Sequence, residues 1–164
     1  MAHVQRRELP AHALSAHYPR EGAYADCYVT TIDRPVTHAA FVTAFYTTWL
    51  FKLERLVLAM LVKKPSTDAE AAALARGERR AFAAWRVEAR APDQLLMCDF
   101  LGQTRSWLMV EATGAGTQLY FGSVVMPGDD PGARGVRYPH RLMLGFHKLY
   151  SRALLAAARS RLSR

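Results

Sequence analysis

The fold of this chain is decided by residues 85–126, which read WRVEARAPDQLLMCDFLGQTRSWLMVEATGAGTQLYFGSVVM. Residues 85–91 alternate apolar and charged side chains at every step, which is typical of a strand with one buried face. Turn-forming residues interrupt the stretch three times, at Pro92-Asp93, at Gly102-Gln103 and at Gly114-Ala115-Gly116. The stretch therefore predicts four antiparallel strands that are joined by hairpin turns.

The lengths of these turns predict which side chains share a face of the sheet. If the turns hold two, two and three residues, one face collects apolar and aromatic side chains from all four strands. Its members would be Trp85, Val87, Ala89, Leu96, Cys98, Phe100, Trp107, Met109, Leu119, Phe121 and Val125. We therefore predict a curved antiparallel sheet with an aromatic inner face, on which the two tryptophans and two phenylalanines of this set point to the same side.

Composition indicates a globular protein with a buried core. The chain has 164 residues, of which 51% are hydrophobic and 22% charged. Cys27 and Cys98 lie in apolar strand patterns without the spacing of a metal site, so we expect reduced core thiols, no metal and no cofactor. The first residues lack the apolar segment of a secretory signal, and no stretch reaches the roughly 20 apolar residues that a membrane span needs. We expect a cytoplasmic protein.

The regions on either side of the four strands predict one domain with an extra N-terminal segment. Residues 1–22 contain scattered proline and glycine and are expected to form a loosely attached arm, and residues 23–164 to form the domain. A strand at 23–35 would lead into one long helix that begins at Thr37 and ends before Pro65. Its apolar side chains recur at helical spacing: Phe41, Phe45, Trp49, Leu53, Leu56 and Met60.

A second helix and a C-terminal helix complete the predicted elements. Residues 67–70 have the form of a capping box and open a short helix, and a longer helix is expected from Pro139 to about Leu162. A strand, two helices, an antiparallel meander and a long C-terminal helix form an order of elements that is also found in a known superfamily.

Several short motifs extend this likeness. They are Trp85-x-Val87, Leu95-Leu96 after Pro92-Asp93, Arg105-Ser106-Trp107-Leu108, Gly116-Thr117-x-Leu119, Phe121-Gly122-Ser123 and Phe146-His147-x-x-Tyr150-Ser151-Arg152. Over residues 23–162 the chain resembles the START-like or Bet v 1-like helix-grip (SRPBCC) superfamily, which includes polyketide cyclases and lipid-transfer domains, and most of all its uncharacterised bacterial members. The resemblance implies an α+β fold in which a curved antiparallel sheet grips the C-terminal helix. The superfamily has no diagnostic catalytic motif, and its usual sheet has more strands between the helices than the four predicted here.

The resemblance also implies a ligand cavity between the sheet and the last helix. Its predicted lining takes aromatic and small residues from the inner face and two polar residues from the helix: Trp85, Phe100, Arg105, Trp107, Met109, Phe121, Ser123, His147 and Tyr150. These residues either surround an open cavity or form a filled core under the helix. His147 is either a hydrogen-bonded core histidine or a general acid or base.

Arg105 is the cation that the predicted register places on the inner face. It needs a partner there, because a buried charge that loses its partner costs about 3–5 kcal/mol. Arg105 either lies at the rim of the sheet, where it reaches solvent or pairs with a carboxylate, or anchors the carboxylate or phosphate of a ligand.

The net charge of +8 is concentrated in the last segment of the chain. The segment from Pro131 to the end holds eight basic residues and no acid. Four of them fall on one face of the predicted helix, at Arg141, Lys148, Arg152 and Arg159. This stripe is either a solvated face or a contact with an anionic membrane surface, whereas nucleic acid is disfavoured because no stacking aromatic residues lie on that face.

We therefore predict a helix-grip domain that binds a small hydrophobic or amphipathic ligand, acidic ligands included. The alternative from a different class is a cyclase- or dehydratase-like enzyme that would use Arg105, His147 and Tyr150 in the same cavity. A third alternative is a non-catalytic interaction module with a filled core. The sequence predicts neither the identity of the ligand nor the oligomeric state.

Overall fold

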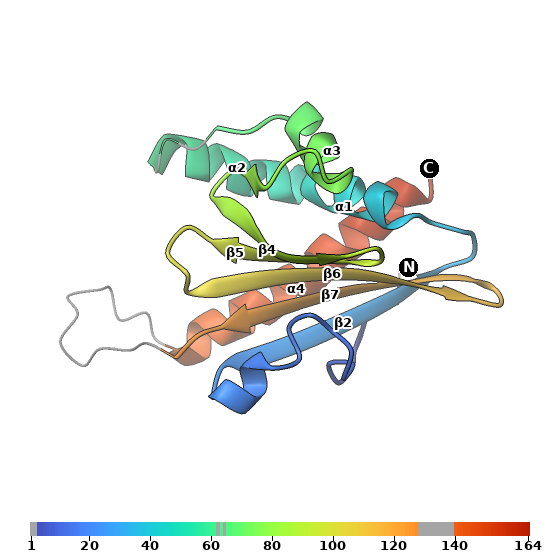
Figure 1. Ribbon diagram of the computed structural model, residues 1–164, viewed down its shortest axis with the longest axis horizontal. Helices are drawn as coiled ribbons and strands as arrows, with labels where there is room; N and C mark the ends of the chain where they lie inside the picture. The colour runs from blue at the N-terminus through green and yellow to red at the C-terminus, as the bar shows by residue number, and fades with distance from the viewer. Residues whose placement is uncertain (1–2, 62, 64, 128–139) are drawn as a thin grey trace.

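The computed structural model describes residues 3–61, 63, 65–127 and 140–164, with side chains described outside 57–59, 61 and 140–147. In chain order the elements are β1 (Gln5–Arg6), the 3-10 helix η1 (Tyr18–Glu21), β2 (Tyr24–Ile32), α1 (His38–Tyr46), α2 (Trp49–Leu61), α3 (Asp68–Ala75), β3 (Ala81–Phe82), β4 (Trp85–Ala91), β5 (Gln94–Asp99), β6 (Thr104–Thr113), β7 (Gly116–Val125) and α4 (His140–Leu162) (Figure 1). The described strands form one seven-stranded antiparallel sheet in the order β1-β2-β7-β6-β5-β4-β3.

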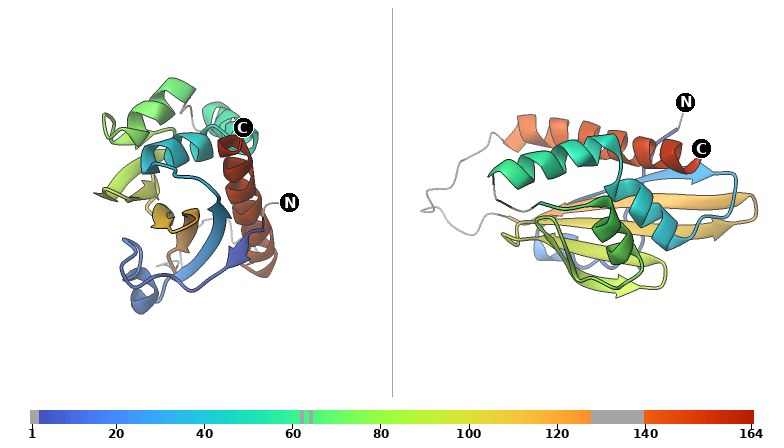
Figure 2. Two further views of the ribbon diagram at one scale, coloured as in Figure 1. Left: turned by 90° about the vertical axis from the view of Figure 1, so that its right-hand side faces the viewer. Right: turned by 90° about the horizontal axis from the view of Figure 1, so that it is seen from above.

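The curved sheet separates two hydrophobic layers. The helices lie on one side, which we call the helix face, and the N-terminal segment with η1 lies on the other, the outer face (Figure 2, left). Packed on the helix face are Tyr28, Phe41, Phe45, Leu95, Leu108, Leu119, Phe121, Leu154 and Leu155. On the outer face are Ala13, Tyr18, Cys27, Val29, Leu96, Trp107, Met109, Tyr120 and Val124. The predicted fold class, an antiparallel sheet that grips a C-terminal helix, is confirmed.

The register between β6 and β7 differs from the predicted one. Thr113 pairs with Gly116, so the turn holds two residues and Trp107 lies opposite Gly122. Gly116 is required in the strand rather than in the turn, because its φ is +155° and a Cβ atom there would lie 2.1 Å from the carbonyl oxygen of Ile32. The one-residue shift turns Leu119, Phe121 and Val125 to the helix face and leaves Trp107 and Met109 on the outer face. The prediction that Trp107 and Phe121 share a face is therefore wrong.

A second departure lies in β4 and in the turn that follows β5. The pairing of β4 with β5 shifts between Val87, which faces Met97, and Ala89, which faces Leu96. This β-bulge places Trp85 and Val87 on the helix face and Ala89 on the outer face. Phe100 lies in the connection between β5 and β6, where it is 52% exposed, and it lines neither layer.

The single long helix predicted from Thr37 is interrupted. Helix α1 ends at Tyr46 with Thr47 as its C-cap. The hydroxyl oxygen of Thr48 accepts a hydrogen bond from the backbone N–H of Phe51 (3.1 Å), which caps the start of α2. The change of direction separates the predicted apolar stripe into two parts. Its first part, on α1, is buried in the core, and its second part, on α2, is exposed.

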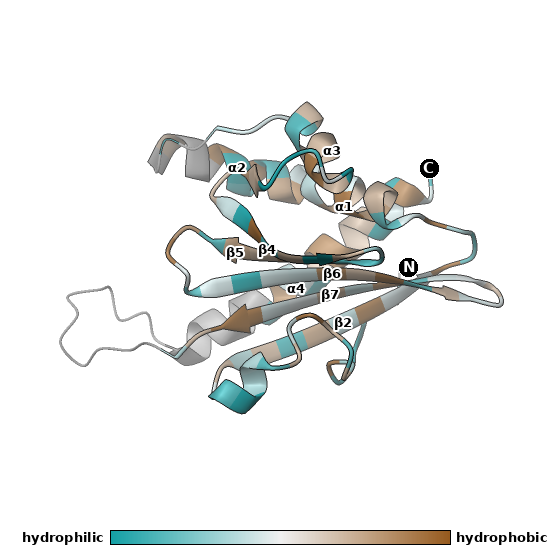
Figure 3. Ribbon diagram, in the orientation of Figure 1, coloured by the Kyte–Doolittle hydropathy of each residue, from teal (hydrophilic) through white to brown (hydrophobic). Residues whose placement is uncertain are grey.

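The N-terminal segment is packed rather than loosely attached. Its residues Ala13 and Tyr18 are buried on the outer face, while η1 itself is hydrophilic (Figure 3). The side-chain amide of Gln94 donates to the carbonyl oxygen of His12 (3.1 Å), and its oxygen accepts from the backbone N–H of Leu14 (2.9 Å). The segment thus covers a hydrophobic layer that would otherwise face water.

The two cysteines are reduced thiols at buried strand positions, as their sequence context predicted. Cys27 and Cys98 are both free and buried, and burial raises the pKa of the Cys27 thiol to about 12. No helix within the described residues is long and apolar enough to cross a membrane. The cytoplasmic location stays a prediction.

Candidate ligand site between the sheet and the last helix

Three of the predicted site residues lie on the outer face, away from α4. Trp107 is fully buried beside Tyr120, and its indole N–H donates to the side-chain oxygen of Gln94 (2.8 Å). Met109 is buried in the same layer. Arg105 lies on the same face, because it pairs with Cys98 on β5 and Val124 on β7. These residues contribute to a packed layer under the N-terminal segment.

Arg105 pairs with a carboxylate, which was one of the two alternatives predicted from the sequence, and the partner is Glu88. Its Nε donates to the hydroxyl oxygen of Tyr18 (3.0 Å) and to Oε2 of Glu88 (3.3 Å), and its guanidinium lies 4.8 Å from the centre of the Tyr18 ring. The Tyr18 hydroxyl in turn donates to Glu88, and burial, followed by Glu88, raises the pKa of Tyr18 to about 12. The bulge in β4 places Glu88 on the outer face, so Arg105 pairs with a carboxylate of its own chain.

A row of buried polar side chains crosses the helix face of the central strands. Asp26 on β2, Ser123 on β7 and Ser106 on β6 are direct cross-strand neighbours, and all three are buried. The backbone N–H and the hydroxyl of Ser123 both donate to Oδ1 of Asp26, at 3.1 and 2.6 Å. We call Asp26, Ser106 and Ser123 the polar row.

Two hydroxyls from the helices are buried in the same layer. The hydroxyl of Tyr46 on α1 is turned toward Ser106, and that of Ser151 on α4 lies on the sheet-facing side of the helix. Within the described part of the chain neither makes a well-formed hydrogen bond. Leaving a buried hydroxyl unpaired costs about 1–3 kcal/mol, so each is suited to a polar group of a bound molecule.

A carboxyl group from α2 also enters this layer. Glu54 accepts a hydrogen bond from the hydroxyl of Tyr150 on α4 (2.5 Å) and another from the side chain of Trp85 on β4. Burial raises the pKa of Glu54, and the two hydrogen bonds oppose that rise. Burial and the neighbouring Glu54 raise the pKa of Tyr150. We call Glu54, Trp85 and Tyr150 the Glu54 cluster.

Aromatic side chains surround these polar groups. The ring of Phe121 lies 4.7 Å from that of Phe45, and Tyr28 and Met97 belong to the same layer. Glu54 lies in these apolar surroundings beside hydroxyl donors. Its carboxyl can therefore bind a hydrogen-bonding ligand or exchange a proton with it. Within the described residues no group of three potential metal ligands is present.

The structure brings together four of the nine predicted site residues: Trp85, Phe121, Ser123 and Tyr150 all lie on the helix face or on α4. The side chain of His147 lies outside the described residues. Asp26 and Glu54 were not predicted as site residues. A lone acid within the apolar strand 24–32 was a signal for Asp26, whereas the inward direction of Glu54 depends on the helix break at Thr48.

Comparison with known proteins adds a weak structural match. No family model matches the chain, and neither does any curated protein. Among solved structures, CalU16 from Micromonospora echinospora matches with 14% sequence identity, over 98% of this chain and 92% of that chain, at a TM-score of 0.33. A likeness at this level says nothing about the function of this chain.

Proposed function

We propose that this chain is a member of the helix-grip superfamily it resembles and binds a small, mainly hydrophobic molecule between the helix face of the sheet and α4. The observation that carries the proposal is the gathering of buried polar groups in this one aromatic layer: the polar row, the Glu54 cluster and the hydroxyls of Tyr46 and Ser151. If this layer served packing alone, apolar residues at these positions would make the fold more stable, because burying polar groups costs free energy.

The polar groups favour a neutral ligand that donates hydrogen bonds. Asp26 and Glu54 offer carboxyl oxygens, and a ligand carboxylate beside them would be repelled. Arg90, which projects on the helix face, donates to the carbonyl oxygen of Leu74 at the end of α3 (2.7 Å). The expectation of an acidic ligand rested on Arg105, which is paired with Glu88 on the outer face. A phenol, an alcohol or an aromatic amine is the better match.

A pair of matched tyrosine variants tests this proposal with 2-naphthol as the probe. Tyr150 and Tyr120 each donate to a glutamate, Glu54 on the helix side and Glu111 on the outer face (2.7 Å). Tyr150→Phe should weaken 2-naphthol binding about 3- to 10-fold, the effect of one neutral hydrogen bond. Tyr120→Phe should leave it unchanged. Equal losses in both variants, or no binding of 2-naphthol to the wild-type protein at millimolar concentration in a fluorescence titration, would contradict the proposal.

The raised pKa of Glu54 favours one second candidate function, a cyclase- or dehydratase-like reaction in the same layer. A carboxyl with a raised pKa can deliver a proton at one step and accept one at another. Glu54→Gln would then keep the binding of a neutral ligand and lose turnover. In a binding protein the same variant would change affinity alone.

A further inference from the structure

Helix α2 exposes a continuous apolar face. Trp49, Leu53, Leu56 and Met60 are 72%, 53%, 54% and 65% exposed, and their spacing of four, three and four residues aligns them on one side of the helix. We call these four residues the α2 ridge. On the neighbouring helix α4, Leu149 is 68% exposed. Scattered exposed apolar residues are common in proteins, but a row along a whole helix marks a contact surface.

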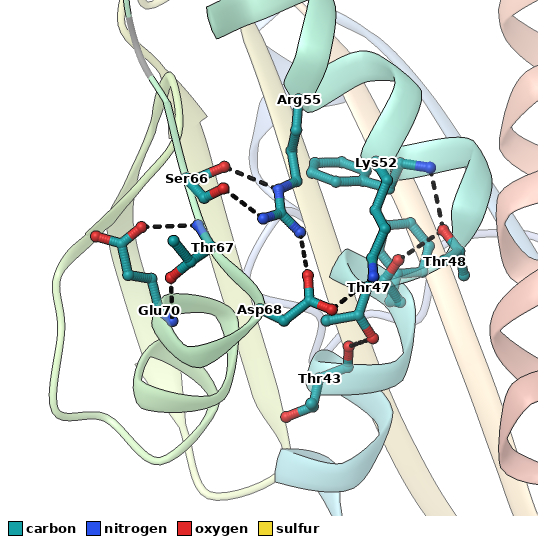
Figure 4. A network of polar contacts seen from close by, with 11 residues as sticks. Thr43, Thr47, Thr48, Lys52, Arg55, Ser66, Thr67, Asp68 and Glu70 are labelled. Carbon is teal, nitrogen blue, oxygen red and sulfur yellow. Dashed lines mark hydrogen bonds and ion pairs between the residues drawn. The ribbon is translucent and has the colours of Figure 1, made fainter.

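Polar contacts on other faces of α2 fix the outward direction of the ridge. Arg55 is 8% exposed and donates to the hydroxyl oxygen of Ser66 (2.9 Å) and to Oδ1 of Asp68 (2.6 Å). Lys52 forms an ion pair with the same aspartate (2.6 Å) (Figure 4). These contacts tie α2 to the start of α3, whose capping box begins at Thr67. The ridge therefore cannot rotate onto the core without breaking them.

We propose that the α2 ridge docks on an anionic membrane surface, with α2 lying in the plane of the lipid headgroups. Helices α2 and α4 lie side by side on the same side of the sheet (Figure 2, right). Together they hold seven basic residues and a single acid, Glu54, which is turned toward Tyr150. An apolar helix face that includes a tryptophan, on a pair of helices with an excess of positive charge, is the pattern of interfacial helices.

The basic residues of α4 contribute unequally to this surface. Arg159 donates to the carbonyl oxygen of Thr31 on β2 (2.6 Å), so it is directed to the edge of the sheet. Arg152 is exposed and makes a long contact of 3.4 Å with the carbonyl oxygen of Val4, and Lys148 is half-buried. Arg161 in the last turn of α4 is also exposed, so Lys148, Arg152 and Arg161 are the described cations of α4 that remain available to lipid headgroups.

A second copy of the chain suits the ridge less well. Among the side chains that the structure describes on α2 and α4, five exposed apolar ones fall far short of the roughly 20–30 residues a side that a stable protein interface uses. Two copies that each carry a formal charge of +8 would also repel one another, whereas an anionic bilayer attracts that charge. This proposal does not depend on the ligand site.

Vesicle co-sedimentation with the full chain tests the proposal. The wild-type protein should bind vesicles of phosphatidylcholine and phosphatidylglycerol (7:3) at 25 mM NaCl, and binding should weaken at 300 mM NaCl because salt screens exposed charges. The double variant Leu53→Ser, Leu56→Ser should lower the partition coefficient about tenfold or more, because it removes apolar area that would be buried in the headgroup region. Leu101→Ser, which changes a leucine of similar exposure (62%) in the loop between β5 and β6, is the matched control and should leave binding unchanged.

Charge is tested separately. Lys148→Gln with Arg152→Gln should weaken binding to the anionic vesicles and leave binding to pure phosphatidylcholine vesicles as it is in the wild-type protein. The proposal is overturned if the wild-type protein stays in the supernatant at low salt, or if the two leucine substitutions have no more effect than Leu101→Ser. It is also overturned if light scattering shows a dimer that the leucine substitutions dissociate while vesicle binding is absent, since the ridge would then be an interface between copies.

Discussion

At the scale of single residues, Arg105 and Glu54 differ most from what their sequence context suggests. From the sequence, Arg105 either reaches solvent or a carboxylate at the rim of the sheet or anchors an acidic ligand. The structure gives it Glu88 and Tyr18, and the Arg105 side chain is only 12% exposed. In the sequence, Glu54 interrupts the apolar pattern of a helix. In the structure its carboxyl points from α2 toward Tyr150 on α4 and Trp85 on β4.

Arg105 is therefore expected to contribute to stability. Arg105→Met should lower the free energy of unfolding by about 1.5–3 kcal/mol, because hydrogen bonds to charged groups are lost and Glu88 is left without its cation. Urea denaturation measures this change, and 2-naphthol affinity per folded molecule should stay as in the wild-type protein. Arg80→Met, at an exposed position, is the control. If Arg105→Met reduced ligand affinity and left stability unchanged, Arg105 would be a ligand anchor after all.

Glu54 gives the chain a pH-dependent stability with a defined sign. Burial raises the pKa of Glu54 in the folded chain, so the protonated carboxyl favours folding. This contribution is fully present below the unfolded pKa of about 4.3 and is lost as the pH rises through the folded pKa.

Glu54→Gln, which cannot ionise, should therefore be more stable than the wild-type protein at pH 7, and the difference should shrink toward pH 4. Urea denaturation from pH 4 to pH 8 measures it, with Glu21→Gln on the exposed η1 as the control. A difference between Glu54→Gln and wild type that does not change with pH would show that folding does not raise the pKa of Glu54.

At the scale of elements, the strands β4 to β7 could be predicted from the sequence. For β5 and β6, the side chains expected to face the helices lie on the outer face instead. Alternation and turn residues locate each strand. The sequence Gly114-Ala115-Gly116 is compatible with a turn of two or three residues, and the choice depends on how closely β2 approaches Gly116. No glycine or proline marks the bulge at Val87. Phe121, Ser123 and Tyr150 were therefore assigned to the helix side correctly, whereas Trp107 and Met109 were not.

The break between α1 and α2, like the bulge in β4, has no clear signal in the local sequence. Thr47 and Thr48 are weak helix formers rather than helix breakers, and tertiary packing with a local cap overrides the continuous apolar periodicity. Because the break reorients α2, it exposes the α2 ridge and turns Glu54 inward. Neither feature could be read from periodicity alone.

The register of β6 and β7 can be tested at Gly122. A Cβ atom at this position would lie 2.9 Å from Cε3 of Trp107 and 2.8 Å from the carbonyl oxygen of Asp26. Gly122→Ala should therefore destabilise the protein by about 1–3 kcal/mol, the usual cost of overpacking. Gly114→Ala, where a Cβ atom meets nothing within 4 Å, should have little effect in the same denaturation experiment. Equal stability of the two variants would mean that Trp107 does not lie opposite Gly122.

At the scale of the whole molecule, the two faces of the sheet have different tasks. The outer face is closed by the N-terminal segment, which Gln94 links to the sheet. The helix face combines aromatic packing with buried carboxyls and hydroxyls. It lies beneath α2 and α4, which together hold seven basic residues and one acid. A ligand on the helix face and a membrane contact on the outside of α2 would therefore lie on the same side of the sheet.

The location of a bound ligand is tested most directly by nuclear Overhauser effects between 2-naphthol and the aromatic protons of the protein. Phe121 and Trp107 lie on neighbouring strands but on opposite faces, so they report on the two layers separately. Binding on the helix face predicts contacts from the naphthol ring to Phe121 and Tyr150 and none to the indole of Trp107. Contacts to Trp107 with none to Phe121 would contradict the proposed site.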